Sequence, residues 1–241
     1  MVTLKMAIIF LMEQIRTPFS LIWTIMSPTV LFFFLHFNEI ELHYGDTAWL
    51  GKQISWFVGY ISFSVVLFNY CLYLVGRRES GFIATFVHNM DGRLLFIRSQ
   101  LIASLIMSIL YVFFFILVVL TGFQASPDYQ IAMIILKSIY INAFMMVSLT
   151  FMASFRVTFQ TASTIYSVLI TVCMVSGIVS LKYNEGIVYW INQVNPIAIY
   201  STILQSDQEL SLMTIFFYSI MLIISIISAL TFKTEPVWSS Q

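Results

Sequence analysis

Long stretches of this chain carry no charged side chain, and the spacing of its charges constrains the fold more than any other feature. A helix needs about 20 apolar residues to cross the hydrocarbon core of a bilayer. Uncharged stretches of that length or more run over 17–38, 53–76, 99–127, 157–181, 186–206 and 210–232, and 129–155 is interrupted only by Lys137. Only 9% of the residues are charged, against about 25% in soluble domains. The sequence therefore predicts an all-α integral membrane protein rather than a soluble enzyme or a disordered chain.

Six of these stretches are predicted to cross the membrane, at about 18–37, 54–75, 99–122, 130–153, 160–181 and 210–232. The seventh, 186–206, contains Asn192, Gln193, Asn195, Pro196 and Gln205. Such polar residues are costly in lipid unless the protein satisfies them internally. We therefore expect a broken, re-entrant helical hairpin over about 186–206 that dips into the interface before the sixth span.

The basic residues give the expected orientation. With six spans and both termini in the cytoplasm, the inner segments hold Lys5, Arg16, Arg77, Arg78, Arg93, Arg98, Arg156 and Lys233, whereas the outer segments hold Lys52 and Lys182. Cytoplasmic loops of membrane proteins carry an excess of Lys and Arg. A seventh crossing would place Lys233 outside, so six spans with an N-in/C-in topology fit the charges better.

The first residues do not resemble a cleavable signal, because the apolar run 6–12 is short and Glu13 follows it. Lys5, Glu13 and Arg16 fall within one quarter of a helical wheel. This pattern predicts an amphipathic helix over 2–16 on the cytoplasmic membrane surface; a frayed apolar tail is the alternative. No repeat or linker divides the chain, so 1–241 is expected to form one transmembrane domain.

Catalytic, metal-binding and nucleotide-binding patterns are not found in the sequence. The predicted spans contain no Asp or Glu pair for proton transfer, and Gly45–Lys52 departs from a phosphate loop in its spacing and its final residue. With eleven basic and eleven acidic residues, no basic surface for nucleic acid is expected. Lys137 lies about two turns inside the fourth span, where its stem either snorkels outward or brings its charge to a substrate or lipid headgroup.

The loop between the second and third spans differs from the others because it combines arginines with an apolar helical pattern. Phe82, Ile83, Phe86 and Val87 recur at a spacing that places them on one helix face. We expect a cytoplasmic helix at about 79–91, begun by Ser80 and ended by Gly92. Its exposed phenylalanines suit a groove on a partner protein, and an interfacial helix on lipid headgroups is the alternative.

With this loop, the sequence resembles the permease subunits of type-2 ABC transporters, most of which are exporters. Arg78, Glu79, Ser80 and Gly81 match the core of the charged motif that follows span two in that family, although Arg77 stands where Glu is more common. Asn195 and Pro196 fall where the family has an Asn-Pro before span six. The resemblance covers nearly the whole chain.

The resemblance implies a half-transporter of the bacterial plasma membrane that binds no cofactor and is itself not catalytic. Two copies of a separate ATPase subunit would bind ATP and Mg²⁺ and push the 79–91 helix. A second permease, identical or homologous, would complete the pathway. The residues that the resemblance assigns to ATPase coupling are Arg77, Arg78, Glu79, Gly81, Phe82, Ile83, Phe86 and Val87.

A polar stripe on the predicted fifth span suits the substrate pathway that the resemblance places between spans two and five. Gln160, Thr164, Ser167 and Thr171 recur on one side of that helix, and Asn69 lies on span two. The alternative is that these residues only allow close helix packing. Hydroxyls without charges favour a hydrophobic or amphipathic cargo, such as a drug, an antimicrobial peptide or a peptide toxin of the phenol-soluble modulin type.

Two other functions remain open at this point. The chain could be a stand-alone membrane protein that confers immunity or scaffolds partners, or it could be a secondary transporter driven by an ion gradient. Association with an ATPase through the 79–91 segment distinguishes the permease from both.

Overall fold

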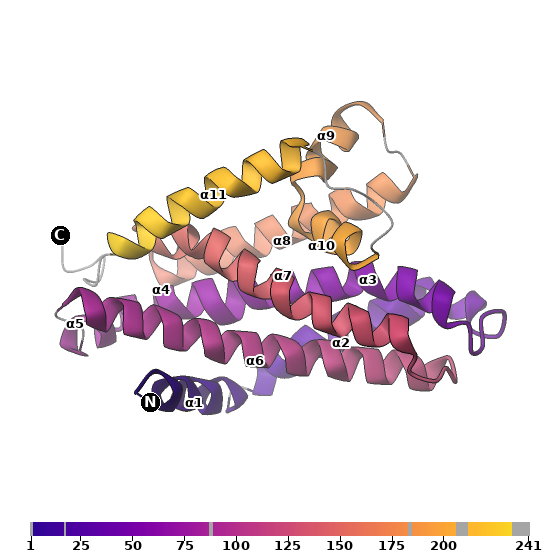
Figure 1. Ribbon diagram of the computed structural model, residues 1–241, viewed down its shortest axis with the longest axis horizontal. Helices are drawn as coiled ribbons and strands as arrows, with labels where there is room; N and C mark the ends of the chain where they lie inside the picture. The colour runs from indigo at the N-terminus through magenta and orange to yellow at the C-terminus, as the bar shows by residue number, and fades with distance from the viewer. Residues whose placement is uncertain (1, 17, 87–88, 183–184, 206–211, 233–241) are drawn as a thin grey trace.

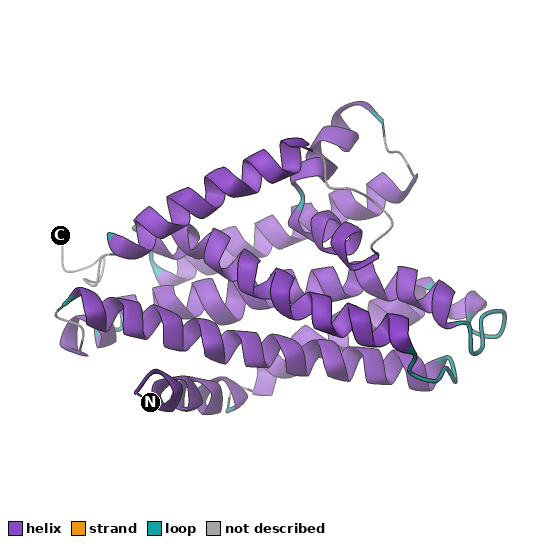
Figure 2. Cartoon of the chain, viewed as in Figure 1, coloured by secondary structure: helices purple, strands orange, loops and turns teal. Residues whose placement is uncertain are grey.

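The computed structural model describes residues 2–16, 18–86, 89–182, 185–205 and 212–232, with only the backbone described at 18–23, 85–86, 181–182 and 213. Within these ranges the regular structure is entirely helical (Figure 2). The elements are α1 (Val2–Ile15), α2 (Pro18–Leu35), η1 (Phe37–Glu39), α3 (Thr47–Ser64), η2 (Val65–Leu72), α4 (Tyr73–Glu79), α5 (Phe82–Phe86), α6 (Met90–Gly122), α7 (Tyr129–Ser154), α8 (Phe159–Lys182), α9 (Gly186–Val194), α10 (Pro196–Gln205) and α11 (Leu212–Leu230).

Four of the described helices are long and apolar enough to cross a membrane: Thr47–Glu79, Met90–Gly122, Tyr129–Ser154 and Phe159–Ser180. The first of them joins α3, the π-helical segment η2 and α4 into one continuous helix. The chain is therefore a multi-pass membrane protein. The other two predicted spans coincide with α2 and α11, whose described apolar parts, Thr24–Leu35 and Thr214–Leu230, are shorter.

The long helices run side by side, and α1 lies alongside α6 at the end of the bundle where α5 is found (Figure 1). Phe10 of α1 packs edge-on against Phe96 of α6, with ring centroids 5.4 Å apart. The opposite side of α1 exposes Ile8, Ile9 and Met12. One side of α1 is thus held by the bundle, and its apolar outer side suits contact with a membrane surface.

The α3–η2–α4 helix lies at the centre of the bundle, with α6, α7, α8 and α10 packed around it. Its buried side chains, including Ile54, Val58 and Leu67, are fully enclosed. The closest approach is at Gly59, where an added Cβ would lie 2.9 Å from the carbonyl oxygen of Ile197 on α10. Because glycine has no Cβ, α10 can settle directly on the backbone of α3.

Candidate functional site

The candidate coupling site lies where α4 ends and α5 begins. Gly81 has φ +73°, a left-handed conformation that glycine adopts without strain, and it breaks the helix between Glu79 and Phe82. The single helix expected over 79–91 is therefore wrong in its bounds. Ser80 ends α4 instead of starting a helix, since its hydroxyl donates to the carbonyl oxygen of Arg77 at 3.0 Å.

The start of α6 gives a second correction. Asn89 is extended, with φ −129° and ψ 170°, and its side-chain oxygen accepts a hydrogen bond from the backbone N–H of Gly92 at 2.8 Å. Gly92 therefore belongs to the first turn of α6 and does not end the preceding helix. Asparagine is a strong N-cap because its side chain satisfies a free N–H of the first turn, and this cap overrides the glycine signal.

Arg77, in the last turn of α4, connects that helix with α1 and α5. Its guanidinium donates to the carboxylate of Glu13 on α1 and, at 2.8 Å, to the hydroxyl oxygen of Tyr73. Tyr73 also donates to the Glu13 carboxylate at 2.5 Å. On its other side the guanidinium carbon lies 4.7 Å from the ring centroid of Phe82 on α5. Arg77 thus joins three helices by charge and by a cation–π contact.

Arg78 points into the protein and connects α4 with the turn between α7 and α8. Its side chain is 1% exposed, and its guanidinium donates to the carbonyl oxygens of Ala153 at 3.0 Å and Val157 at 2.9 Å. Glu79 approaches it, with the Arg78 Nε 3.8 Å from a Glu79 carboxylate oxygen. Carbonyls at the C-terminal end of a helix have no partner within the helix, so Arg78 closes the end of α7.

The α5 side chains divide between the protomer and its surface. Ile83 is fully buried in the core, and Phe82 is partly buried beneath Arg77. Ile83 therefore anchors α5 and is not displayed to a partner, unlike the exposed apolar face expected from the sequence. The side chain of Phe86 and the whole of Val87 lie outside the described residues.

These contacts link five helices at one end of the molecule. Through Arg77, Arg78 and the close packing of Gly76 against the ring of Phe159 at the start of α8, the end of α4 contacts α1, α5, α7 and α8. The charged hydrogen bonds of Arg77 and Arg78 are costly to break, so they hold the end of α4 to α1 and α7, and α5 meets this end through the contact of Phe82 with Arg77. The arrangement can pass a push on α5 into the transmembrane helices.

The predicted pathway stripe lies on the outer surface of α8. Gln160, Thr164, Ser167 and Thr171 are all exposed, and they sit among exposed valines and isoleucines of the same helix. The hydroxyls of Thr164, Ser167 and Thr171 donate to carbonyl oxygens four residues earlier, at 2.8–3.1 Å. The stripe is therefore not used in packing within the protomer.

The structure places Asn69 away from this stripe. Asn69 is buried in η2, where its side-chain amide lies 3.4 Å from the hydroxyl oxygen of Tyr111 on α6. Its backbone carbonyl accepts hydrogen bonds from Gln14 at 3.3 Å, Gln100 at 2.7 Å and Ser104 at 2.9 Å. Asn69 thus belongs to a polar network that ties α1 and α6 to the π-helical segment.

Asn195 and Pro196 lie at the junction of α9 and α10, and Asn195 fastens that junction to α8. Its side-chain amide donates to the carbonyl oxygen of Cys173 at 2.8 Å and to the hydroxyl of Ser176 at 3.1 Å, while its side-chain oxygen accepts from the Ile197 N–H. Asn195 serves as the cap of α10 and as a bridge between helices.

Sequence reasoning missed two partners of the arginines, Glu13 and Tyr73, and the carbonyls that Arg78 binds. The sequence held one indication of the Glu13 contact: Glu13 is the only acidic residue before Glu39.

No three His, Cys, Asp or Glu side chains gather as a metal site within the described part of the chain. No protein-family model matches this chain.

Proposed function

We propose that this chain is the non-catalytic permease subunit of a type-2 ABC exporter in a bacterial plasma membrane. The observation that supports this proposal best is the junction at the end of α4. There Arg77 contacts both α5 and α1, and the neighbouring Arg78 binds carbonyl oxygens at the end of α7. A partner that moves α5 would act on the whole bundle. The six-span, N-in/C-in topology belongs to this proposal.

The energy source in this proposal is a separate ATPase, present in two copies, that binds ATP and Mg²⁺. ATP binding changes the geometry of the ATPase dimer, and the permease is the two-state element that this change biases. A second permease copy would face the α8 stripe of Gln160, Thr164, Ser167 and Thr171, because these polar side chains are exposed and unused within the protomer. The proposed cargo is amphipathic or hydrophobic.

The proposal is tested by co-purification with the ATPase encoded by a neighbouring reading frame. The Phe82→Asp/Phe86→Asp double variant should lower recovery of the ATPase at least about tenfold, since a buried aromatic anchor dominates interfaces of this kind. Phe37→Asp is the matched control, because Phe37 is an exposed phenylalanine of η1, between α2 and α3. The proposal that α5 contacts the ATPase would be contradicted if the control lost as much ATPase as the double variant, or if the double variant recovered the ATPase in full.

A second test addresses transmission through Arg77. The single variants Glu13→Arg and Arg77→Glu should each uncouple ATP hydrolysis from transport, because each places like charges together. The double variant Glu13→Arg/Arg77→Glu restores an opposite-charge pair and should restore coupling in part. If the double variant is no better than the worse single variant, the ion pair has no part in coupling.

A further inference from the structure

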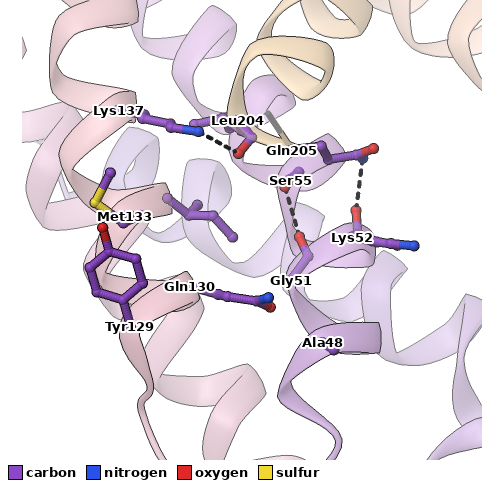
Figure 3. Close-up of a pocket in the computed structure, with 11 residues that line it drawn as sticks. Ala48, Gly51, Lys52, Ser55, Tyr129, Gln130, Met133, Lys137, Leu204 and Gln205 are labelled. Atoms are coloured by element: carbon purple, nitrogen blue, oxygen red, sulfur yellow. Dashed lines mark hydrogen bonds between the residues drawn. The ribbon is translucent and has the colours of Figure 1, made fainter. Parts of the chain in front are cut away.

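A polar pocket of about 560 Å³ lies between α3, α7 and α10, at the end of the bundle remote from α5 (Figures 1 and 3). The polar side chains that line it belong to Lys52, Ser55, Tyr129, Gln130, Lys137 and Gln205. Among the described residues of its lining there are two ammonium groups and no carboxylate. The pocket therefore has a positive character in a protein of zero net charge.

Its polar groups are held in place by backbone contacts. Lys137 Nζ lies 3.5 Å from the carbonyl oxygen of Leu204 at the end of α10, and the amide of Gln205 donates to the Lys52 carbonyl oxygen at 3.2 Å. In Figure 3 the Gln130 amide points across the pocket toward Gly51, while the Lys52 ammonium turns outward at the rim. Lys137 is thus the inner cation, and Lys52 is an exposed cation at the rim.

The depth of Lys137 suits a lipid headgroup. It follows Tyr129, the first residue of α7, by eight residues, which is roughly 12 Å along a helix. An ammonium at that depth is expensive in hydrocarbon unless it reaches polar groups. Anionic headgroups are the negative groups that a bilayer supplies near its surface. Basic pockets between transmembrane helices bind such headgroups on the cytoplasmic side of membranes, and this pocket would do the same at the end of the bundle remote from α5.

A separate apolar groove lies farther along α7, toward the middle of the bundle. It measures about 440 Å³ and is lined by Tyr140, Ile141, Phe144 and Met145 of α7, with residues of α10 and α11. Lys137 and Ile141 are four residues apart, and Phe144 follows three later, so pocket and groove share one face of α7. On α10, Gln205 lines the pocket, whereas Ile203 and Ile199 line the groove from another side of that helix.

We infer that this pocket and groove form a binding site for an anionic amphiphile with a phosphate headgroup. The phosphate contacts Lys137 and Gln130, with Lys52 closing over it, and an acyl chain occupies the groove between α7, α10 and α11. The charge of the pocket and the apolar lining of the groove match the two halves of one such molecule. The site uses no residue of the α4–α5 junction and stands whether or not an ATPase partner exists.

The test measures binding of four probes to the purified full-length protein in neutral detergent, by native mass spectrometry and by thermal shift. The probes are dioctanoyl phosphatidylglycerol, dioctanoyl phosphatidylcholine, glycerol phosphate and inorganic phosphate. Phosphatidylglycerol should bind about tenfold more tightly than phosphatidylcholine, which has the same chains without the net charge. Equal affinities for these two lipids would overturn the role of charge. Glycerol phosphate or inorganic phosphate binding as tightly as phosphatidylglycerol would overturn the role of the groove.

Variants then locate the site. Lys137→Gln should lower phosphatidylglycerol affinity about tenfold, and Gly51→Leu should abolish binding, because a side chain there points at Gln130 and Ile134. Lys5→Gln, which removes an exposed charge on α1, is the matched control and should bind as the unchanged protein does. If Lys137→Gln fails to fold, Gly51→Leu decides alone. Unchanged binding by Gly51→Leu, or equal losses with Lys5→Gln and Lys137→Gln, would overturn the site.

Discussion

Two helices of almost equal hydropathy have opposite surroundings in this protein. The most apolar window of the α3–η2–α4 helix has a mean hydropathy of 1.7 and is 83% buried, whereas that of α8 has a mean hydropathy of 1.9 and is 28% buried. Hydropathy reports transfer from water to an apolar medium, and neighbouring helices and lipid are both apolar. It cannot show which of the two surrounds a given span.

The polar side chains of the two helices differ in the same way. On the central helix Tyr70 shares a hydrogen bond of 2.9 Å with Thr150 of α7, and Cys71 lies 3.5 Å from the carbonyl oxygen of Leu149. On α8 the hydroxyls of Thr164 and Ser167 donate within their own helix. Polar groups thus join the central helix to its neighbours, while the hydroxyls of the exposed α8 stripe bond within α8 itself. Four predictions test this contrast.

The largest effect is expected at the C-terminal end of the central helix. Arg78→Ala removes two charged hydrogen bonds to buried carbonyl oxygens, which should lower the free energy of unfolding by about 3 kcal/mol. The fall in the melting temperature of the detergent-purified variant measures this loss of stability. Arg98→Ala is the control, because Arg98 is exposed on α6. A similar loss of stability in Arg78→Ala and Arg98→Ala would show that the two hydrogen bonds of Arg78 contribute nothing beyond its positive charge.

The next effect is steric and compares two glycines of α3. Gly59→Ala places a Cβ 2.8 Å from the Cβ of Tyr200 and 2.9 Å from the Ile197 carbonyl oxygen, and such overpacking should cost roughly 1–3 kcal/mol. In Gly51→Ala the nearest atoms are 3.7 Å away, so no loss is expected. Thermal unfolding of the pair measures the difference, and equal stabilities would exclude a tight α3–α10 contact at Gly59.

A third pair compares one substitution in the two surroundings. Thr150→Val leaves the buried hydroxyl of Tyr70 without its partner and should cost about 1–2 kcal/mol. Thr164→Val, on the exposed side of α8, should change stability by less than about 0.5 kcal/mol. Melting curves of the single protomer are the measurement. A larger loss for Thr164→Val would mean that α8 is buried in the purified protein, as it would be in a dimer.

The smallest effect lies at the start of α7, outside the buried spans. Hydrogen bonds from the Thr47 side chain and the Ile131 N–H hold the pKa of Asp128 below its ordinary range. A lowered pKa stabilises the folded state above about pH 4, and that contribution is lost as the pH falls through the folded pKa. Asp128→Asn keeps a capping side chain. In this variant the melting temperature should fall less steeply with pH below about pH 4 than in the unchanged protein. An unchanged pH profile in that variant would contradict the contribution of Asp128.

Helix positions were largely predictable because they depend on local chemistry. The predicted stretches 99–122, 130–153 and 160–181 lie within α6, α7 and α8, although α6 begins nine residues earlier than predicted, at Met90. The polar run predicted at 186–206 corresponds to α9 and α10, which meet at Asn195. The segment after α4 was predicted less well. There Gly81 and the Asn89 cap, rather than Ser80 and Gly92, set the helix ends.

The candidate coupling site was predictable as a cluster along the chain but not as a set of contacts. Arg77, Arg78 and Phe82 stand close in sequence, whereas the arginines' partners Glu13, Ala153 and Val157 are more than 60 residues away along the chain. Charge patterns assign such residues to one end of the bundle. Which side chains meet there depends on how the helices are rotated against one another.

The sequence by itself determined the membrane class and the helices, because hydropathy and chain-breaking residues act over one or two turns. Only the tertiary structure decided that Asn69 faces α6, that the α8 stripe faces outward, and that Lys137 adjoins a pocket rather than open lipid. Each of these depends on the rotation and neighbours of a helix. Packing and interhelical hydrogen bonds set both, and they join residues that are distant in the sequence.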